Sequence, residues 1–214
     1  MRGTATIDAI IEVGEAHGFE TDHALQVTRL TLRLFDELQP LHGMGNTERI
    51  WLRAAALLHD VGKARDPKQH HKLAQEIILS SPELPFRPEE CVIIGLVARY
   101  HRGPLPQNDH KYYRDLDADG RRYVRKLASL LRLADGLDKG HCGLVEALQC
   151  DIRRRRVHIE LVSRRIPNLA SALAKADLFQ HIFRKKAVFH LALVPRSSDP
   201  ALDFGHGLIY ADMN

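Results

Sequence analysis

The sequence AAALLHDVGK, residues 54–63, joins a run of small and apolar residues to a polar end. His59 and Asp60 stand side by side at the end of a predicted helix over residues 47–60, and Gly62 is a residue type that commonly ends helices. Two interpretations fit this arrangement: a capped helix end with no further role, or half of a metal site. At a helix end the backbone turns enough for two neighbouring side chains to reach one ion, so the second interpretation requires further ligands elsewhere in the chain.

Apolar residues at helical spacing surround this stretch. Val27, Leu30 and Leu34, for example, recur on one face of a predicted helix. The same periodicity predicts helices over residues 5–17, 21–39, 47–60, 70–81, 88–101 and 117–138. The chain is therefore predicted to be mainly α, with a helical body over residues 1–140.

The sequence changes character after Gly140. The elements predicted there are strands over residues 144–152, 156–162 and 188–194 and a helix over residues 168–187. The arginines from Arg153 to Arg156 join the first two strands and predict a hairpin turn. This part predicts a small C-terminal α+β unit over residues 141–214, packed on the helical body within one structural domain.

The composition excludes several classes of protein. A chain of 214 residues with 44% hydrophobic residues can bury a core, but it has no run of about 18 apolar residues that could span a membrane. The first residues lack the basic-then-apolar pattern of a secretory signal. The three cysteines, an odd number without CxxC spacing, favour free thiols in a reducing compartment, so a cytoplasmic location is expected.

The chain carries a mild excess of positive charge. The formal net charge is +4, and the sequence pI is about 9.0. This mild excess suits an anionic substrate or weak contact with nucleic acid. The arginines from Arg153 to Arg156 have no aromatic residues interleaved with them and are typical of a solvated turn, so nucleic-acid binding is not expected.

The chain holds 13 histidines, and several of them fall, together with aspartates, on otherwise apolar helical faces. These inward polar residues are His23, His59, Asp60, His101 and Asp135, and His70 stands at the start of a helix. Burying one such group is costly unless it is paired or coordinated, and each alone is typical of a hydrogen-bonded core residue or a helix cap. The whole set, spread over separate helices, favours metal binding. Mixed imidazole and carboxylate ligands suit manganese, iron, cobalt, nickel or zinc, whereas magnesium (Mg) prefers more oxygen ligands.

The segments TDHALQV, LLHDVGK, QHHKLAQEII, ARYHRG and RLADGLD follow the order found in the HD-domain superfamily of metal-dependent phosphohydrolases, which the chain resembles. Longer segments such as RRYVRKLASLLRLADGLDKGH and AKADLFQHIFRKK resemble the C-terminal HD domain of the exopolyphosphatase/guanosine-pentaphosphatase family, over about residues 5–194. The resemblance implies an HD-domain helical bundle. In that family, actin-like ATPase-fold domains precede the HD domain, so the chain is expected to be a free-standing relative.

The resemblance also implies a set of metal ligands. These are His23, His59, Asp60 and Asp135 for a core ion, and His70 and His101, with Asp60 as the bridge, for a second ion. The neighbouring His71 is an alternative to His70. Some related proteins have a further histidine at the position of Leu73, and its absence here weakens the case for two ions. One divalent transition metal ion is therefore expected, with a second ion as the alternative.

Residues beside these ligands are candidates for catalysis and substrate binding. A bound cation activates water and polarises a phosphoryl oxygen, and the charge that develops on the oxygens needs fixed positive groups. Lys63, Arg102 and Lys139 closely follow candidate site residues and are the predicted substrate-binding cations, although each also fits a cation at a helix end or a solvated surface cation. Asp60 and Lys63 are predicted to be catalytic. Asp138 is predicted either as a general acid or base or as a residue that orients a ligand.

Two functions fit this sequence. The first is a metal-dependent phosphohydrolase that acts on a phosphomonoester, a nucleotide or a polyphosphate-like anion. The second is a non-catalytic HD module that serves dimerisation or regulates a partner such as an exopolyphosphatase-type protein. The apolar, β-rich C-terminal unit suits an interface, so a homodimer is expected in either case. The loops over residues 64–69 and 103–114 carry no motif that identifies a base or a sugar.

Overall fold

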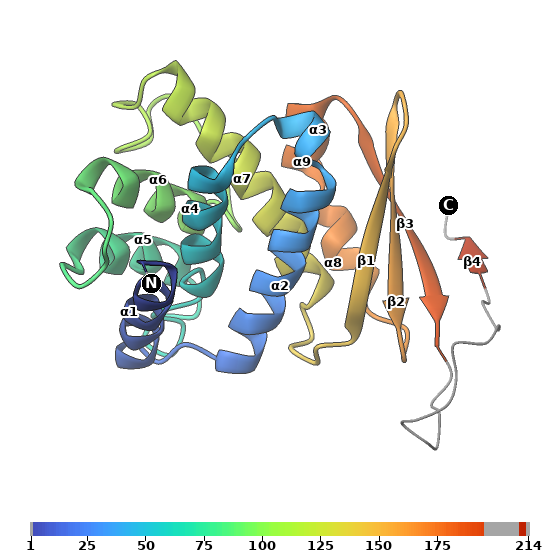
Figure 1. The fold of residues 1–214 in the computed structure, drawn as a ribbon, viewed down its shortest axis with the longest axis horizontal. Coiled ribbons are helices and arrows are strands. Elements are labelled where there is room, and N and C mark those ends of the chain that lie inside the picture. The colour runs from blue at the N-terminus through green and yellow to red at the C-terminus, as the bar shows by residue number, and fades with distance from the viewer. Residues whose placement is uncertain (1, 195–209, 213–214) are drawn as a thin grey trace.

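The structure, a computed structural model, describes residues 2–194 and 210–212 of the chain. A helical body forms one side of the molecule and a small sheet the other, with short helices between them (Figure 1). The helices of the body are α1 (Arg2–Ala16), α2 (Thr21–Glu37), α3 (Gln39–His42), α4 (Asn46–Leu57), α5 (His70–Ser80), α6 (Pro88–Arg99) and α7 (Ala118–Leu137). The remaining elements are β1 (Val145–Ile152), β2 (Arg156–Ser163), α8 (Leu169–Ala174), α9 (Asp177–Phe183), β3 (Lys186–Leu193) and β4 (Tyr210–Asp212). The fold is mainly α, as predicted; residues 195–209 and 213–214 of the predicted C-terminal unit lie outside the described residues.

Helix α7 is the centre of the body, because almost every residue of its second half is buried. Leu127, Leu131 and Ala134 are each 0% exposed. The helix packs against α2, α4 and α6 of the body and against α8 and α9 on the side of the sheet. The same hydrophobic cluster therefore extends from Ile10 in α1 to Leu191 in β3. Although α7 has 20 residues, neither it nor any other helix in the described part of the chain is long and apolar enough to span a membrane.

Helix α4 ends earlier than its sequence pattern predicts. The last helical residue is Leu57, and residues 58–65 form turns. Gly62 adopts a φ of +84°, in the left-handed region, where a Cβ atom would also lie only 3.0 Å from the Cβ of Leu73. His59 and Asp60 therefore stand in a tight turn just beyond the helix, and both are buried.

The prediction of a single helix over residues 168–187 is wrong. The segment forms α8 and α9, which are separated by Lys175 and Ala176, and β3 already begins at Lys186. Arg184 adopts a left-handed φ of 53°, which ends α9 and turns the chain toward the strand. Both short helices pack on α7, but α9 also contacts β3. The break between the two helices allows α9 to pack against the strand as well.

The described strands form a four-stranded sheet in the order β1-β2-β3-β4. Strands β1 and β2 are the predicted antiparallel hairpin, β2 and β3 are parallel with α8 and α9 in their connection, and β3 pairs with β4 antiparallel. On β2, Val157, Ile159 and Leu161 are buried, whereas the residues between them are partly or fully exposed. This alternation gives the sheet one face on the core and one outer face.

Close contacts fix the sheet unit to the helical body. A Cβ atom on Gly136 of α7 would lie only 2.6 Å from the Cα of Ala172 in α8, so the approach of the two helices requires glycine. On the other side, Arg33 of α2 donates a hydrogen bond from Nε to the carbonyl oxygen of Leu148 in β1, at 3.1 Å. The residues after α7 are thereby held against the same helices that carry the polar cluster described next.

Candidate metal centre

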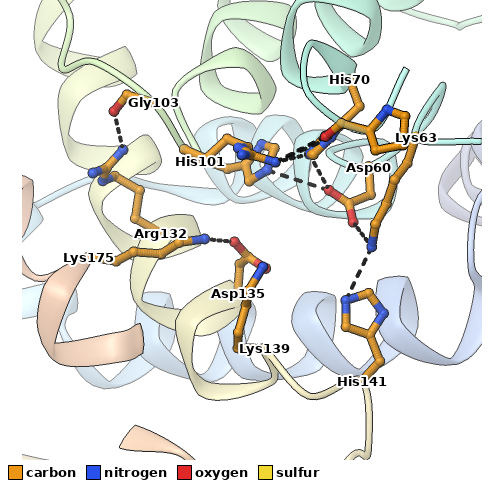
Figure 2. A pocket seen from close by; sticks show the side chains of 12 residues that line it. Asp60, Lys63, His70, His101, Gly103, Arg132, Asp135, Lys139, His141 and Lys175 are labelled. Carbon is orange, nitrogen blue, oxygen red and sulfur yellow. Dashed lines mark hydrogen bonds and ion pairs between the residues drawn. The ribbon is translucent and has the colours of Figure 1, made fainter. Parts of the chain in front are cut away.

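Asp60 lies at the centre of a cluster of histidines. Its Oδ1 atom is 3.1 Å from Nε2 of His70 and 3.5 Å from Nε2 of both His59 and His101. Its Oδ2 atom is 3.9 Å from Nε2 of His23. Figure 2 shows the carboxylate of Asp60 pointing toward His70 and His101. One carboxylate thus joins imidazoles that come from α2, from α5 and from the turns after α4 and α6.

Three of these imidazoles have their Nδ1 atom bound to the backbone. His59, His70 and His101 each donate from Nδ1 to the carbonyl oxygen three residues earlier, at 2.8, 2.8 and 2.7 Å. Because a carbonyl only accepts hydrogen bonds, Nδ1 carries the proton and Nε2 keeps its lone pair. The carbonyls used by His59 and His101 lie in the last turns of α4 and α6, where helical partners run out. The helix ends therefore set the tautomer of these rings.

His23 reaches the same arrangement through a carboxylate. Its Nδ1 atom lies 2.8 Å from Oδ2 of Asp138, whose Oδ1 accepts a hydrogen bond from the backbone N–H of Gly143 at 2.8 Å. A carboxylate in this position fixes the tautomer and the orientation of a histidine ring, as the outer partners of metal-bound histidines do. Asp138 is buried, and its carboxylate contacts Nδ1 of His23 rather than the Nε2 atom that faces Asp60 and Asp135.

Asp135 on α7 completes the cluster. Its Oδ1 atom is 3.6 Å from Nε2 of His23 and 4.0 Å from Nε2 of His59. Its other oxygen, Oδ2, forms an ion pair with Nζ of Lys175. The structure thereby brings together all the predicted ligand residues, which are His23, His59, Asp60, His70, His101 and Asp135.

The carboxylates of the cluster are held in their ionised form. Burial would raise the pKa of Asp60, but the neighbouring imidazoles, His59 foremost, lower it well below its usual range. Burial would likewise raise the pKa of Asp135, but the nearby ring of His23 and the charge of Lys175 lower it well below the usual range. Both groups are therefore acceptors, which is the state in which a carboxylate binds a cation.

The histidines divide into two kinds. Burial lowers the pKa of His59 and His101, so both rings are neutral at pH 7 and ready to act as ligands. Burial would also lower the pKa of His23, but the nearby carboxylates of Asp135 and Asp138 outweigh it and raise the pKa to about 9. As a ligand of a metal ion, His23 would therefore have to release a proton.

The donor atoms of the cluster fit a divalent cation. Among the described residues, Nε2 of His23 and Nε2 of His59 are buried without a hydrogen-bond partner, which is costly for a polar atom. His23, His59 and Asp135 offer three ligand atoms within 4.8 Å of one another, and His59, Asp60 and His101 form a second set of this kind. Neutral imidazoles combined with carboxylates are ligands of first-row divalent metals. The donor atoms of the cluster therefore suit the predicted divalent metal ion.

The structure distinguishes His70 from His71. The ring of His70 faces Asp60, whereas His71 packs beside Gly103, where a Cβ atom would lie 3.5 Å from Nε2 of His71. His71 is thereby directed to the loop after α6. Of the two neighbours, His70 is the one that belongs to the cluster.

A cavity of about 400 Å³ opens beside the cluster. It is lined by the ligand candidates Asp60, His70, His101 and Asp135 and by the predicted cations Lys63, Arg102 and Lys139. Nζ of Lys63 lies 3.0 Å from Oδ2 of Asp60, and Nη1 of Arg102 lies 3.4 Å from Nε2 of His70. The cavity therefore places fixed positive groups next to the candidate ligands, as an anionic substrate requires.

His141 is a site residue that sequence reasoning missed. It follows α7 with a left-handed φ of 51°, and its ring stacks on that of His23 with centroids 3.7 Å apart. Its Nε2 atom is 3.2 Å from Nζ of Lys63, and its Nδ1 atom pairs with the carboxylate of Glu20. His141 lies in a turn rather than on a periodic face, so no helical pattern could place it in the site.

Arg132 and Lys175 also line the cavity and were missed. Arg132 lies on α7 three residues before Asp135, so its position on the same helical stripe was a usable signal. Lys175 stands in the break between α8 and α9, which the continuous apolar pattern of that segment conceals. Only the break itself turns its side chain toward the helical body.

Comparison with models of protein families matches residues 6–181 to the family described as Ppx/GppA phosphatase, domain III. The matched region covers more than half of the 214-residue chain. It contains every residue of the histidine and aspartate cluster and extends through α8 into α9. None of the curated proteins matches the chain.

Proposed function

Because the chain belongs to the Ppx/GppA phosphatase domain III family, we propose that it is a metal-dependent phosphohydrolase whose active centre is the cluster around Asp60. The proposed substrate is a phosphomonoester, a nucleotide or a polyphosphate-like anion. One observation carries the proposal. Four buried imidazoles hold Nδ1 to an outer partner and direct Nε2 toward two ionised carboxylates. A set of merely structural histidines would have no reason to share this orientation.

We also assign the helical body to the HD type within this proposal. The residues that support it are His23 on α2, His59 and Asp60 after α4, and Asp135 on α7. They occur along the chain in the order of the superfamily that the sequence resembles. The turn after α4 supports the pairing of His59 with Asp60, because it buries both side chains at one point.

The proposed ligands of a first ion are His23, His59, Asp60 and Asp135, and those of a second ion are His70 and His101, with Asp60 shared. The sharing is supported by the position of Asp60, whose Oδ1 lies 3.5 Å from Nε2 of His59 in the first set and 3.1 Å from Nε2 of His70 in the second. A manganese, iron, cobalt, nickel or zinc ion bound there supplies Lewis acidity and an activated water molecule.

The cations of the chain would hold the phosphate of the substrate. Lys63 is kept in place by Asp60 and by Glu20, whose Oε1 lies 3.4 Å from Nζ of Lys63. Arg102 and Lys139 line the other parts of the cavity. Among the described residues that line it, there is no Phe, Tyr or Trp on which a base could stack. In this proposal, these cations recognise the charge of the phosphate groups.

The test is the substitution Asp60→Ala. We expect the variant to stay folded but to lose both bound metal and phosphate release, because the carboxylate contacts every imidazole of the cluster. Metal per chain is measured by elemental analysis after loading with manganese, iron or nickel. Phosphate release is measured with p-nitrophenyl phosphate, nucleotides and inorganic polyphosphate. Asp8→Ala, at an exposed position on α1, serves as the matched control and is expected to behave like the parent.

Two results would contradict this assignment. Phosphate release that survives Asp60→Ala unchanged would show that the cluster is not the catalytic centre. A parent protein that binds metal through Asp60 but hydrolyses none of these substrates would favour the alternative function, a non-catalytic module for dimerisation or for a protein partner.

A further inference from the structure

On the basis of the proposed function, we propose that Lys175 binds the phosphate of the substrate, so that the C-terminal unit supplies a residue to the active centre. Lys175 lines the same cavity as Lys63 and Lys139. Figure 2 shows its side chain reaching across the cavity with the ammonium group directed at Asp135. The cations predicted from the sequence come from the helical body, whereas Lys175 comes from the connection between α8 and α9.

Asp135 lies between Lys175 and the imidazoles. Its Oδ1 atom faces Nε2 of His23 at 3.6 Å, while its Oδ2 atom pairs with Lys175. A metal ion held by His23, His59 and Asp135 would neutralise this carboxylate in place of Lys175. The ammonium group of Lys175 then requires another anion at the same place, and a phosphate that enters the cavity supplies it.

Two contacts hold Lys175 in position, one on each side of it along the chain. Three residues earlier, Ala172 packs so closely on Gly136 that an added Cβ atom would lie 2.6 Å from the Cα of Ala172. Two residues later, Asp177 accepts hydrogen bonds from Nη2 of Arg132 at 3.0 and 3.1 Å. The side chain of Arg132 is 6% exposed and also donates to backbone carbonyls of the segment after α6. The break that carries Lys175 is thus preorganised, which lowers the entropy lost on binding.

The exposure of the two partners supports a role beyond that of a counter-ion. The side chain of Lys175 is 17% exposed on the side of the cavity, whereas that of Asp135 is 9% exposed. An ammonium group has three donors, and one carboxylate oxygen does not use all of them. Phosphate oxygens in the cavity are the acceptors that the other donors can reach.

The experiment measures the binding of inorganic phosphate to the manganese-loaded full chain by isothermal titration calorimetry. The parent is compared with Lys175→Met, Lys175→Arg and Lys72→Met, in which an exposed lysine of α5 outside the cavity is lost. We expect Lys175→Met to raise the dissociation constant of phosphate by about tenfold or more, the effect of losing one hydrogen bond between charged groups. Lys175→Arg keeps the charge and is expected to restore most of the affinity. Lys72→Met should match the parent, and manganese per chain should be the same in all four proteins.

Two outcomes overturn this inference. If Lys175→Met binds phosphate as tightly as the parent does, Lys175 does not contact the phosphate. If Lys175→Met loses its manganese, Lys175 acts only as a structural support for Asp135. Hydrolysis is measured in parallel, because a parent that binds phosphate through Lys175 without any turnover would contradict the proposed function and leave the role of Lys175 intact.

Discussion

Histidines lie next to carboxylates in two regions of the molecule, the helical body and the outer face of the sheet. On the sheet, Nδ1 of His158 in β2 lies 2.7 Å from Nε2 of His190 in β3, and the two rings stack with centroids 5.0 Å apart. Asp151 and Glu160 line the same small cavity. The residue types are those of the candidate metal centre, but each set of three donor atoms found among the described residues includes His23 or His59 of the body, and none includes a residue of the sheet.

The two regions differ in the hydrogen-bond partners of the histidine ring nitrogens. In the body, the backbone or Asp138 takes Nδ1, and Nε2 is left for a shared centre. On the sheet, His158 and His190 bind each other, so one ring nitrogen of each is used within the pair. Composition alone therefore does not make a metal site. The outer hydrogen bonds have to direct several lone pairs to one point.

His42 adds a third case, because it is buried in the body but lies outside the cluster. Its Nε2 atom bonds to the carbonyl oxygen of Phe35 at 2.7 Å, and its Nδ1 atom accepts from the backbone N–H of Met44 at 3.0 Å. Both nitrogens are thus satisfied by the backbone, and no lone pair is left for an ion. Burial by itself does not distinguish a ligand from a core histidine.

The largest effect on metal affinity is expected from replacing a histidine of the body with glutamine. The same replacement on the sheet is the comparison. His23→Gln removes a buried ring whose Nε2 faces both carboxylates, and we expect metal affinity to fall by more than about 100-fold, beyond the loss that an outer partner causes. His158→Gln on the sheet should leave the affinity unchanged. Competition with a chelating dye measures both. Equal losses in the two variants, or no loss in His23→Gln, would contradict the assignment of the site to the body.

A smaller effect is expected from the outer partner of His23. Asp138→Asn keeps the shape of the side chain but has one oxygen in place of two. It can therefore no longer accept hydrogen bonds from Nδ1 of His23 and from the N–H of Gly143 through separate oxygens. Metal affinity should fall by about 10- to 100-fold, while the fold is retained. Asp151→Asn beside His158 is the matched control. An affinity equal to that of the parent in Asp138→Asn would show that this hydrogen bond does not orient the ring.

The smallest effect concerns His42 and the pH dependence of stability. Burial lowers the pKa of His42 in the folded state, so the unfolded chain takes up a proton first as the pH falls. The stability that neutral His42 contributes is therefore present above the unfolded pKa of about 6.5 and is lost as the pH falls below it, with a slope of at most about 1.4 kcal/mol per pH unit. Urea unfolding of the metal-free protein between pH 7 and pH 5 should show a shallower loss for His42→Gln than for the parent.

The pH dependence assigned to His42 is checked with a control variant. His181→Gln, at an exposed position in α9, should keep the pH dependence of the parent. A parent and a His42→Gln variant with parallel curves would mean that His42 takes up its proton equally well in the folded and unfolded states.

Much of the fold was predictable because local spacing sets it. The apolar stripes of α2 and α7 recur at helical intervals, and the runs around Arg153 to Arg156 predicted the β1–β2 hairpin, which the structure has. The match to the Ppx/GppA phosphatase family agrees with the family that the sequence resembles. The break at Lys175 was not predictable, because the apolar residues of α8 and α9 keep the pattern of one helix and only their packing on α7 and β3 separates them.

The inward positions of His23 and Asp135 followed from helical periodicity alone, because both lie on apolar helical stripes. His59 and Asp60, in contrast, are buried by the turn after α4. Which of those residues meet, and through which atoms, was decided by the tertiary structure. His23 and Asp138 are separated by 115 positions, and their hydrogen bond forms only because α2 and α7 pack side by side. His141 and Lys175 enter the cavity through turns that end helices, where no repeat exists to predict a direction. Local spacing determines which face a residue is on, but the orientation of a ring nitrogen depends on distant partners.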